Sequence, residues 1–239
     1  MHSKHSSEYS GSNLLANIEE YLPRYNQHIF DLICSNLEFK KGDAQKIADF
    51  GAGTGTLAEL FRTEAKSSPL CIEIDDTLRK KLIEKGFTAV KDIDSVCELF
   101  STIYSSNVLE HIQDDEQILE QLYEKLEPGG LLILYLPALE ILYSKLDLSI
   151  GHFRRYNKSE IVSKLESKNF RVLQVQYCDI LGLISTLILK FFRFSFRPNA
   201  QSSKLMKIYD SFILPISVFL DEIFFKKIAG KNLFVVAMK

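Results

Sequence analysis

The residues between Lys46 and Thr56 constrain the chain more than any others, because a short apolar segment runs directly into three glycines at alternate positions. The apolar segment predicts a buried strand, and the residues after the glycines have the spacing of a helix. A turn built from glycines has few side chains in the way, so a ligand can lie against its backbone. The first N–H groups of the helix then face that ligand. We therefore expect a nucleotide-binding site here.

The spacing of the glycines separates two kinds of nucleotide site. A dinucleotide site requires Gly-x-Gly-x-x-Gly, whose third glycine lets the helix pack closely beside a pyrophosphate. Here the third glycine comes one residue early, and the required position holds Thr56. A Gly-x-Gly-x-Gly turn after an acid instead resembles motif I of the class I S-adenosylmethionine-dependent methyltransferases. The resemblance implies that the turn wraps the amino-acid end of the cofactor and that the acid helps to hold its ammonium group. The implied contacts are Asp49, Gly51, Ala52, Gly53 and Gly55.

Acidic residues at the ends of the next two predicted strands fit the rest of such a cofactor. Glu73 ends an apolar run 22 positions after Gly51, and a carboxylate there can accept hydrogen bonds from both ribose hydroxyls. We expect the adjacent Ile74 to contact the cofactor as well. In the resembled family an acid at the position of Asp92 accepts a hydrogen bond from the adenine amine, while the N–H of Ile93 meets the ring. The alternative for Asp92 is an N-cap on a short helix.

A further predicted strand ends in a polar turn at residues 101–112. Residues 106–112, the acids that follow them and a helix ending at 126–130 are similar to the corresponding segment of small-molecule methyltransferases of the UbiE/UbiG type. The Pro-Gly-Gly at 128–130 predicts the end of that helix and a turn into a buried strand. The resemblance covers about residues 44–179. It implies an α/β fold with a doubly wound, Rossmann-like sheet of seven strands, the last antiparallel, and helices on both faces.

The turn after this strand holds the residues closest to where chemistry would occur. Methyl transfer from a sulfonium is an in-line displacement that mainly needs an aligned nucleophile and the exclusion of water. A proton acceptor matters only when the nucleophile is a weak acid such as a hydroxyl, and His111 is the candidate catalytic base. The alternative is that His111 only braces the turn, while the acceptor is already anionic or loses its proton to water.

The same turn raises the question of a metal. Some methyltransferases with Glu-x-x-Glu-His at this position bind a divalent cation that gathers the oxygens of the substrate. This chain has Asn107 in place of the first glutamate, and a neutral amide weakens a site for a hard cation. We therefore expect no metal, with Glu110, His111 and His152 as the only ligands if one binds. Asn107 is interpreted as a cofactor contact.

Residues 151–160 are dense in polar, aromatic and cationic side chains. They resemble a Gly-His-x-Arg-Arg-Tyr element of bacterial methyltransferases, and after the fifth predicted strand they would face the methyl-transfer pocket. We expect substrate contacts among His152, Arg154, Arg155 and Tyr156, with the arginines favouring an anionic or oxygen-rich group. The alternative is that the arginines pair with acids on neighbouring helices.

The segment before the first strand has helical spacing from 14 to 39, interrupted at Pro23. In the resembled family such leading helices often close over the cofactor, so Arg24, Tyr25 and Asn26 at the interruption are candidate contacts for the cofactor or the substrate, with Tyr25 assigned to the substrate. Ordinary packing at a helix start is the alternative.

Length and composition fit one core. The chain has 239 residues, 46% of them hydrophobic, so we expect a mobile polar tail at 1–13 and a single domain at 14–239. No apolar stretch of the kind found in a secretory signal follows the tail, so we expect no such signal. The four cysteines show no paired spacing and are interpreted as reduced thiols in the core of a cytoplasmic protein.

The last part of the chain differs from the rest. Between two predicted strands, residues 180–228 form an apolar, phenylalanine-rich insertion with helical spacing. Residues 180–239 contain nine Lys/Arg and three Asp/Glu. Its apolar runs are shorter than the roughly 18 residues of a membrane span. A cationic amphipathic pair of helices suits the plane of an anionic lipid surface, and we expect peripheral contact with the inner face of a membrane. A lid over the substrate, a lid packed on the sheet and a subunit interface are the alternatives.

These features predict an S-adenosylmethionine-dependent methyltransferase acting on a small-molecule or lipid-like acceptor, at oxygen more than at carbon or nitrogen. A non-catalytic cofactor-binding scaffold and an NAD-dependent dehydrogenase are the rivals. The net charge of −2 and the lack of a basic docking motif give no reason to expect nucleic acid. We expect a monomer or a homodimer.

Overall fold

A computed structural model of the protein describes residues 21–37, 46–191 and 200–239. Seven strands form one sheet in the order β3-β2-β1-β4-β5-β7-β6. β7 is antiparallel to both of its neighbours, and the other paired strands are parallel. The predicted doubly wound sheet with an antiparallel last strand is confirmed. The strands are β1 (Ile47–Phe50), β2 (Leu70–Ile72), β3 (Ala89–Val90), β4 (Phe100–Ser106), β5 (Leu126–Pro137), β6 (Arg171–Cys178) and β7 (Asn232–Met238).

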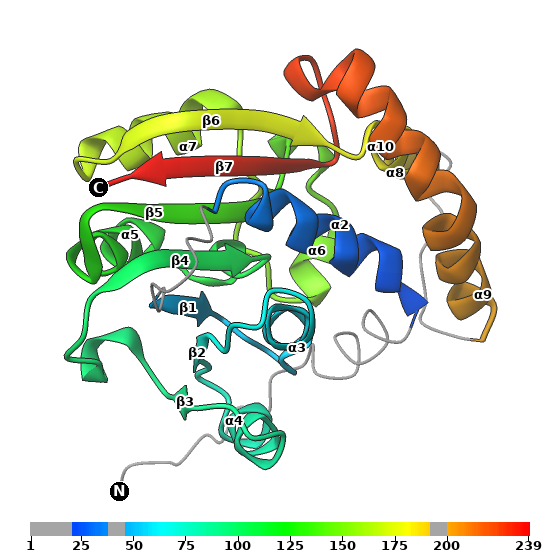
Figure 1. Cartoon of the computed structure of the whole chain (residues 1–239). Coiled ribbons are helices and arrows are strands. Elements are labelled where there is room, and N and C mark those ends of the chain that lie inside the picture. The colour runs from blue at the N-terminus through cyan, green and yellow to red at the C-terminus, as the bar shows by residue number, and fades with distance from the viewer. Residues whose placement is uncertain (1–20, 38–45, 192–199) are drawn as a thin grey trace, which may run out of the picture.

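Helices cover both faces of the sheet (Figure 1). α2 and α3 lie on one face and α5 and α7 on the other. The helices are α2 (Pro23–Cys34), α3 (Thr56–Thr63), α4 (Asp76–Glu84), α5 (Asp115–Glu124), α6 (Lys145–Ser149), α7 (Lys158–Ser167), α8 (Ile180–Phe191), α9 (Ala200–Ile208) and α10 (Leu214–Ile223). Short 3₁₀ turns are η1 (Ile93–Ser95), η2 (Leu109–His111), η3 (Glu140–Leu142) and η5 (Phe225–Lys227), and Tyr209–Ile213 form a π-helical turn, η4.

The alternation of side chains along the strands explains the two faces. In β5, Leu132 and Leu134 pack with α5 and α7. Ile133 and Tyr135, which alternate with them along the strand, pack with α2 and α3. The same alternation separates Ile103 from Tyr104 in β4. Successive residues of a strand point to opposite faces, so an unbroken apolar run fills both layers. The sheet is therefore covered by apolar contacts on both faces.

One boundary differs from the prediction. α5 ends at Glu124, and residues 126–137 all belong to β5, so Pro128 and the two glycines after it lie inside the strand. The register with β4 shifts between the Phe100 and Thr102 pairs, and Gly129 has a φ of +79°. The extra residues form a bulge, which tolerates proline and uses glycine at a positive φ.

The insertion before β7 is helical and is held to the domain by buried polar contacts. Asp210 of η4 accepts hydrogen bonds from the backbone N–H groups of Arg24 and Tyr25, at 3.0 and 2.9 Å. Asp221 of α10 accepts from the N–H groups of Asp179 and Ile180, where β6 passes into α8. α9 and α10 consequently lie beyond the end of α2 at the edge of the molecule (Figure 1). None of the described helices is both long enough and apolar enough to cross a membrane.

The tail at 1–13 and residues 14–20 of the expected helix before Pro23 lie outside the described residues. Cys71 and Cys178 are buried, as expected of core thiols, but Cys97 is exposed. Cys97 lies in the irregular link between η1 and β4, and Cys34 at the end of α2 is half-buried.

Candidate functional site

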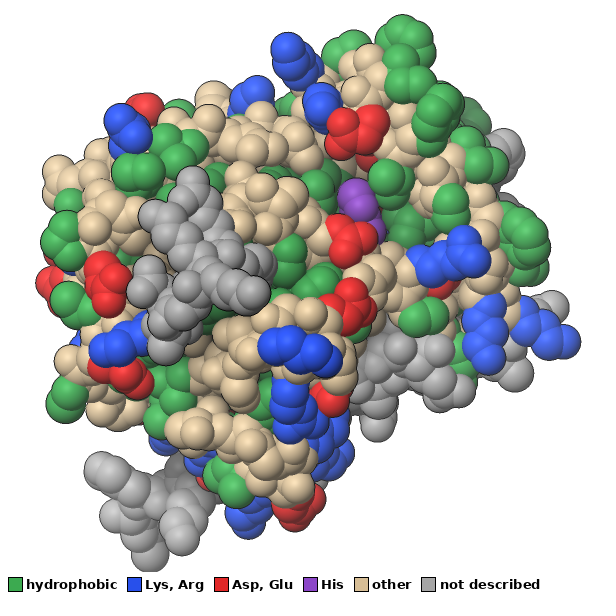
Figure 2. All heavy atoms as spheres, in the orientation of Figure 1, with side chains coloured by type: hydrophobic (Ala, Val, Ile, Leu, Met, Phe, Trp, Pro, Cys, Tyr) green, Lys and Arg blue, Asp and Glu red, His purple; other side chains and the backbone are tan. Residues whose placement is uncertain are grey.

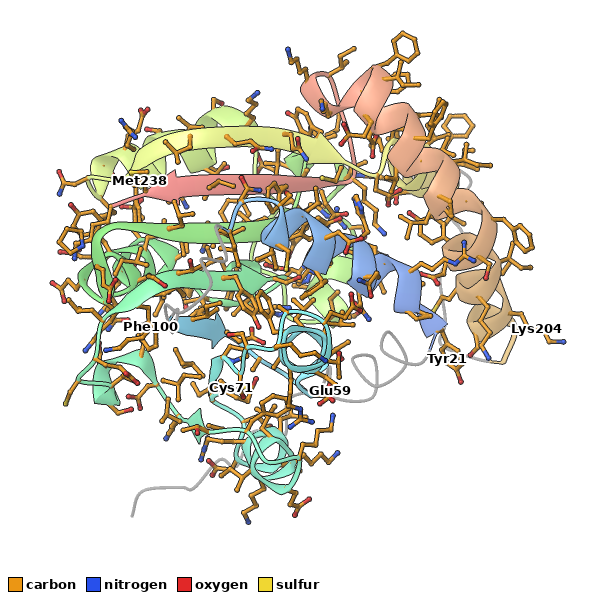
Figure 3. All side chains as sticks on the ribbon, viewed as in Figure 1. Tyr21, Glu59, Cys71, Phe100, Lys204 and Met238 are labelled. Carbon is orange, nitrogen blue, oxygen red and sulfur yellow. The ribbon has the colours of Figure 1, made fainter. Side chains whose placement is uncertain are left out.

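The glycine turn joins β1 to α3, and each of its glycines has a left-handed backbone. A Cβ on Gly51 would lie 2.3 Å from Val108 Cγ2, and one on Gly55 would lie 2.6 Å from Leu82 Cδ2. A Cβ on Gly53, with φ +57°, would meet no atom within 4 Å. Gly51 and Gly55 are therefore needed for packing, while Gly53 borders open space where a ligand can approach the backbone. Figure 3 shows this region near the labelled Cys71 of β2 and Glu59 of α3.

Glu73 lies at the end of β2 and contacts the turn directly. Its Oε2 accepts a hydrogen bond from the Gly53 N–H at 2.7 Å, and its Oε1 accepts from the Asp75 N–H at 2.9 Å. Asp75 caps α4, as expected for an acid at a helix start. Glu73 is buried, and burial raises its pKa. These contacts hold the carboxylate beside the turn, where the predicted ribose contact requires it.

Asp49 is the last residue but one of β1, just before the turn, and is buried. Burial raises the pKa of its carboxyl to about 7, and the nearby Glu73 carboxylate acts in the same direction. Bringing a cation to this carboxyl would offset the cost of burying its charge. The position fits the predicted role beside the ammonium group of a cofactor.

The other predicted cofactor contacts lie at the ends of neighbouring strands. Ile74 follows β2 with a side chain 76% exposed, whereas Ala52 and Ile93 are buried. Asp92 caps η1, because its Oδ1 accepts a hydrogen bond from the Ser95 N–H at 3.1 Å. This is the alternative that the sequence left open. The bond uses only one of the two carboxylate oxygens. Asn107 has a φ of +54°, and its side chain donates to Ser106 Oγ.

The structure brings three predicted residues together beyond the end of β4. Glu110 and His111 lie on η2 and His152 follows α6, with a backbone hydrogen bond from Phe153 to Glu110 joining the two segments at 2.7 Å. The His111 and His152 rings are nearly perpendicular, with centroids 4.5 Å apart. His152 Nε2 lies 3.7 Å from Glu110 Oε1.

Burial changes the proton affinity of this cluster. It raises the pKa of Glu110 to about 8 and lowers that of His111 to about 4, with His152 also lowering the latter. Both oxygens of Glu110 are buried and have no hydrogen-bond partner among the described residues. A buried carboxyl without partners is costly in a folded protein, so it needs an explanation beyond packing.

Asp147 is a residue of this region that the sequence did not identify. Its Oδ1 lies 3.1 Å from His152 Nδ1 and accepts from Arg155 Nε at 2.8 Å. Although burial opposes it, the His152 hydrogen bond and the Arg155 charge hold the pKa of Asp147 well below its usual range. The sequence signal was only a capping pattern, Ser144 followed by an acid three positions later, and that pattern does not indicate a partner for His152.

The two arginines and Tyr156 contact acids of the protein. Arg154 pairs with Asp115 of α5 at 2.7 Å, and Arg155 pairs with Asp147 at 2.8 Å. Tyr156 is fully buried and donates to Asp115 at 2.8 Å. These contacts match the alternative in which the motif pairs with neighbouring helices. Within this motif, the His152 ring packs against His111 of the cluster.

Tyr25 lies close to the turn after β4 through its place at the start of α2. Its ring meets Tyr135 of β5 edge-on, with centroids 5.9 Å apart, and its side chain interacts with that of Asn107. Burial raises the pKa of Tyr25 well above its usual value, so it stays a neutral hydroxyl. α2 thus places a polar group near the predicted methyl-transfer position.

Comparison with known proteins identifies this arrangement. A family model described as a methyltransferase domain matches residues 18–175, and no curated protein matches the chain. An S-adenosylmethionine-dependent methyltransferase from Archaeoglobus fulgidus is 17% identical, with a TM-score of 0.58 over 90% of this chain and 94% of that one.

Two further solved structures show the same fold. One from Thermotoga maritima is 13% identical, with a TM-score of 0.63 over 96% and 98% of the two chains. Phosphoethanolamine N-methyltransferase 2 from Haemonchus contortus, in complex with S-adenosylmethionine, is 15% identical, with a TM-score of 0.59 over 89% of this chain and 52% of that chain. The chain belongs to the methyltransferase-domain family and is an S-adenosylmethionine-dependent methyltransferase.

Proposed function

We propose that the protein transfers a methyl group to an oxygen of a small, lipid-like acceptor, as an enzyme of the UbiE/UbiG type. The observation that carries this proposal is the cluster of Glu110, His111 and His152 at the end of β4, beside the turn that holds Asn107. S-adenosylmethionine supplies a methyl group already activated by its sulfonium charge. The cluster then has to align the acceptor oxygen and handle its proton.

His111 is the proposed proton acceptor. Its lowered pKa, about 4, keeps the imidazole neutral near pH 7, and a neutral imidazole has a lone pair for a hydroxyl proton. The ring also forms a hydrogen bond with the Gly151 backbone, which fixes its orientation. Methylation at carbon or nitrogen is the alternative, and so is a protein that binds the cofactor without catalysis.

The remaining predicted contacts are assigned to the two substrates. Asp49, Glu73, Asp92, Asn107 and the glycine turn would hold the cofactor, with Ile74 and Ile93 beside its adenine. Tyr25 and His152 would face the acceptor. Arg154 and Arg155 would act by holding Asp115 and Asp147, and Tyr156 by supporting Asp115.

Calorimetry and an acceptor screen test the proposal together. We expect S-adenosylhomocysteine to bind more tightly than NAD. We also expect methyl transfer to a component of a lipid extract, detected by mass spectrometry, and turnover at least tenfold slower for His111→Ala. Absence of binding at millimolar ligand would contradict the cofactor assignment. Full turnover by His111→Ala would remove the assignment of the base, and a methyl group on nitrogen or carbon would overturn the choice of oxygen.

The lipid-like nature of the acceptor is supported by the surface of the insertion. We define the outer apolar surface as six side chains that are 51 to 83% exposed: Ile188, Phe191, Leu205, Phe212, Phe219 and Phe224. Hydrophobic side chains gather along this edge of the molecule over α9 and α10 (Figure 2). Apolar side chains in such number on one edge favour contact with a lipid or a protein.

The charges of the insertion favour a lipid partner. Within its described residues, Asp210 and Asp221 are buried and Glu222 pairs with Lys226, so the outward charge is mainly that of lysines. Lys204 projects outward from α9 (Figure 3). Lysines beside exposed phenylalanines suit an anionic bilayer surface. We therefore propose that the insertion docks the enzyme on the inner face of a membrane, from the cytoplasmic side.

A further inference from the structure

We propose that Glu110, His111 and His152 bind a divalent transition-metal ion, such as Zn²⁺, in the methyl-transfer site. Each residue offers one ligand atom, and the three atoms lie within 4.8 Å of one another. Ligands at about 2 Å from a shared ion lie roughly 3 to 4 Å apart, so small side-chain rotations would close the set. Only the use of the ion in catalysis rests on the function proposed above; ion binding does not depend on it.

The carboxylate of Glu110 is the observation that first points to a ligand. The residue is 0% exposed, and neither of its oxygens accepts a hydrogen bond from another described residue. Its nearest cationic candidate is His152, at 3.7 Å, which is too long for a hydrogen bond. A buried acid held without partners, and aimed at two imidazoles, is the donor arrangement that a metal ion completes.

The imidazole of His152 is oriented as in a metal ligand. Its Nδ1 lies 3.1 Å from Asp147 Oδ1, and the ionised Asp147 can only accept hydrogen bonds, so the proton of the ring is on Nδ1. In the neutral ring, Nε2 carries the lone pair, on the side of Glu110. Arg155 and Ser144 hold the Asp147 carboxylate in turn. A carboxylate behind a histidine fixes both its tautomer and its direction in known metal sites.

The imidazole of His111 is held from behind in the same way. The ring hydrogen-bonds the Gly151 backbone, and its Nδ1 lies 3.7 Å from the place of a Cβ on Gly151. The remaining nitrogen can face Glu110 and His152. The Gly-His-x-Arg-Arg element thus serves both histidines. Its Gly151 contacts His111, and its Arg155 holds Asp147, the carboxylate partner of His152.

The donor set selects the kind of ion. Two imidazoles and one carboxylate suit Zn²⁺, Mn²⁺ or Fe²⁺, while Mg²⁺ and Ca²⁺ prefer oxygen donors. Asn107, which replaces the acid of the longer pattern, is not needed, and its amide donates to Ser106. The expectation of no metal rested on that replacement. Three protein ligands leave coordination positions open for acceptor oxygens.

The ion would change how the acceptor loses its proton. A hydroxyl bound to a divalent cation has a lower pKa, so the acceptor hydroxyl would give its proton to solvent water near neutral pH without a strong base in the protein. In the ion-loaded protein His111 would be a ligand, whereas its proton-accepting role belongs to the protein without the ion. The cation would also favour acceptors with two adjacent oxygens, such as a catechol, since both can reach one ion.

Titration of tag-free protein with Zn²⁺ tests the site without any methyl acceptor. We expect one ion per chain by calorimetry and a rise in melting temperature. Mg²⁺ should give neither effect. Glu110→Gln and His152→Asn should each weaken Zn²⁺ binding at least tenfold, and Asp147→Asn, which leaves all three ligands in place, by about 10- to 100-fold. Glu116→Gln removes an exposed acid from α5 and should bind as the wild type does.

The outcomes separate this inference from the proposed function. S-adenosylhomocysteine binding is measured on each variant, and its retention shows that the variant is folded. Zn²⁺ binding that survives in a folded Glu110→Gln, His152→Asn double variant would place the ion elsewhere and overturn the inference, as would no Zn²⁺ binding by the wild type. Neither result would remove the methyltransferase assignment, which S-adenosylhomocysteine binding tests separately.

Discussion

Gly53 is the glycine of the turn whose substitution separates ligand binding from folding. A Cβ there would meet no atom within 4 Å, but the φ of +57° is strained for any other residue. We expect Gly53→Ala to lower the free energy of unfolding by about 1 kcal/mol and to weaken S-adenosylhomocysteine binding at least tenfold, because the new methyl occupies the ligand side of the turn. Urea unfolding and calorimetry measure the two effects.

Gly55→Ala is the matched control. Its Cβ would lie 2.6 Å from Leu82 Cδ2, so overpacking adds to the backbone strain and the loss of stability should be about 2 kcal/mol or more. The fraction that stays folded should bind the ligand more tightly than Gly53→Ala does. The reverse order of affinities would contradict an open ligand face at Gly53.

Asp49 gives the cofactor site a pH dependence of known sign. Burial raises its pKa to about 7, so in the free protein the carboxyl is mostly protonated below that pH and ionised above it. The ionised form attracts an ammonium group, so S-adenosylhomocysteine affinity should rise between about pH 6 and pH 8. Asp49→Asn should bind more weakly and show less of this rise, measured by calorimetry at each pH. An exposed acid, changed in Glu98→Gln, should leave the rise intact; an unchanged profile in Asp49→Asn would contradict the assignment.

At the scale of elements, the contact between α2 and the insertion depends on one buried acid. The side chain of Leu22, at the N-cap position of α2, has no hydrogen-bond acceptor. The carboxylate of Asp210 takes this role and accepts hydrogen bonds from the backbone N–H groups of Arg24 and Tyr25. Removing this acceptor leaves buried donors unsatisfied. We expect Asp210→Ala to lower stability by about 1 to 2 kcal/mol and to speed proteolysis within the insertion.

Glu222→Ala supplies the comparison for Asp210→Ala. Glu222 belongs to the same helical insertion but is exposed, and it pairs with Lys226 at the surface, so its removal should change stability by less than about 0.5 kcal/mol. Unfolding by urea and limited proteolysis apply to both variants. Equal losses of stability would show that the cap of α2 does not depend on Asp210.

Elements with local signals could be predicted, and long-range pairs could not. The cap by Asp75 and the glycine turn follow from rules that act within a few residues. The bulge at Pro128 depends on the register of β5 against β4, which no local rule states. The pairing of Arg155 with Asp147 likewise depends on how the chain returns after α6. Sequence spacing therefore found His152 but not the carboxylate that orients it.

For the whole molecule, the order of the strands follows from alternating strand and helix segments, because crossover connections restrict the topology. The partner of the insertion is not set by such rules. Its helices contact the domain through buried polar groups and through an apolar cluster that includes Ile180 and Leu183, while the side chains of the outer apolar surface face outward. Local amphipathicity indicates a surface of this kind but does not distinguish a membrane, an acceptor and a second subunit.

Vesicle flotation distinguishes these partners. We expect the protein to float with vesicles containing phosphatidylserine, to bind less at high salt because screening weakens the lysine contacts, and to bind poorly to pure phosphatidylcholine. A triple variant with Phe191→Ser, Phe219→Ser and Phe224→Ser should lose flotation, since each phenylalanine is more than 60% exposed. Its cofactor binding should be unchanged.

The control for flotation replaces exposed apolar residues on other elements, Ile83→Ser of α4 and Leu173→Ser of β6, which are 55% and 45% exposed. It should float like the wild type. Sedimentation of the same proteins decides the main rival: a wild-type dimer that becomes a monomer in the triple variant, with no flotation of either, would make the outer apolar surface a subunit interface. If flotation is restricted to anionic vesicles and is lost only in the triple variant, the outer apolar surface must contact the bilayer. Binding by charge alone would persist after the phenylalanines are replaced.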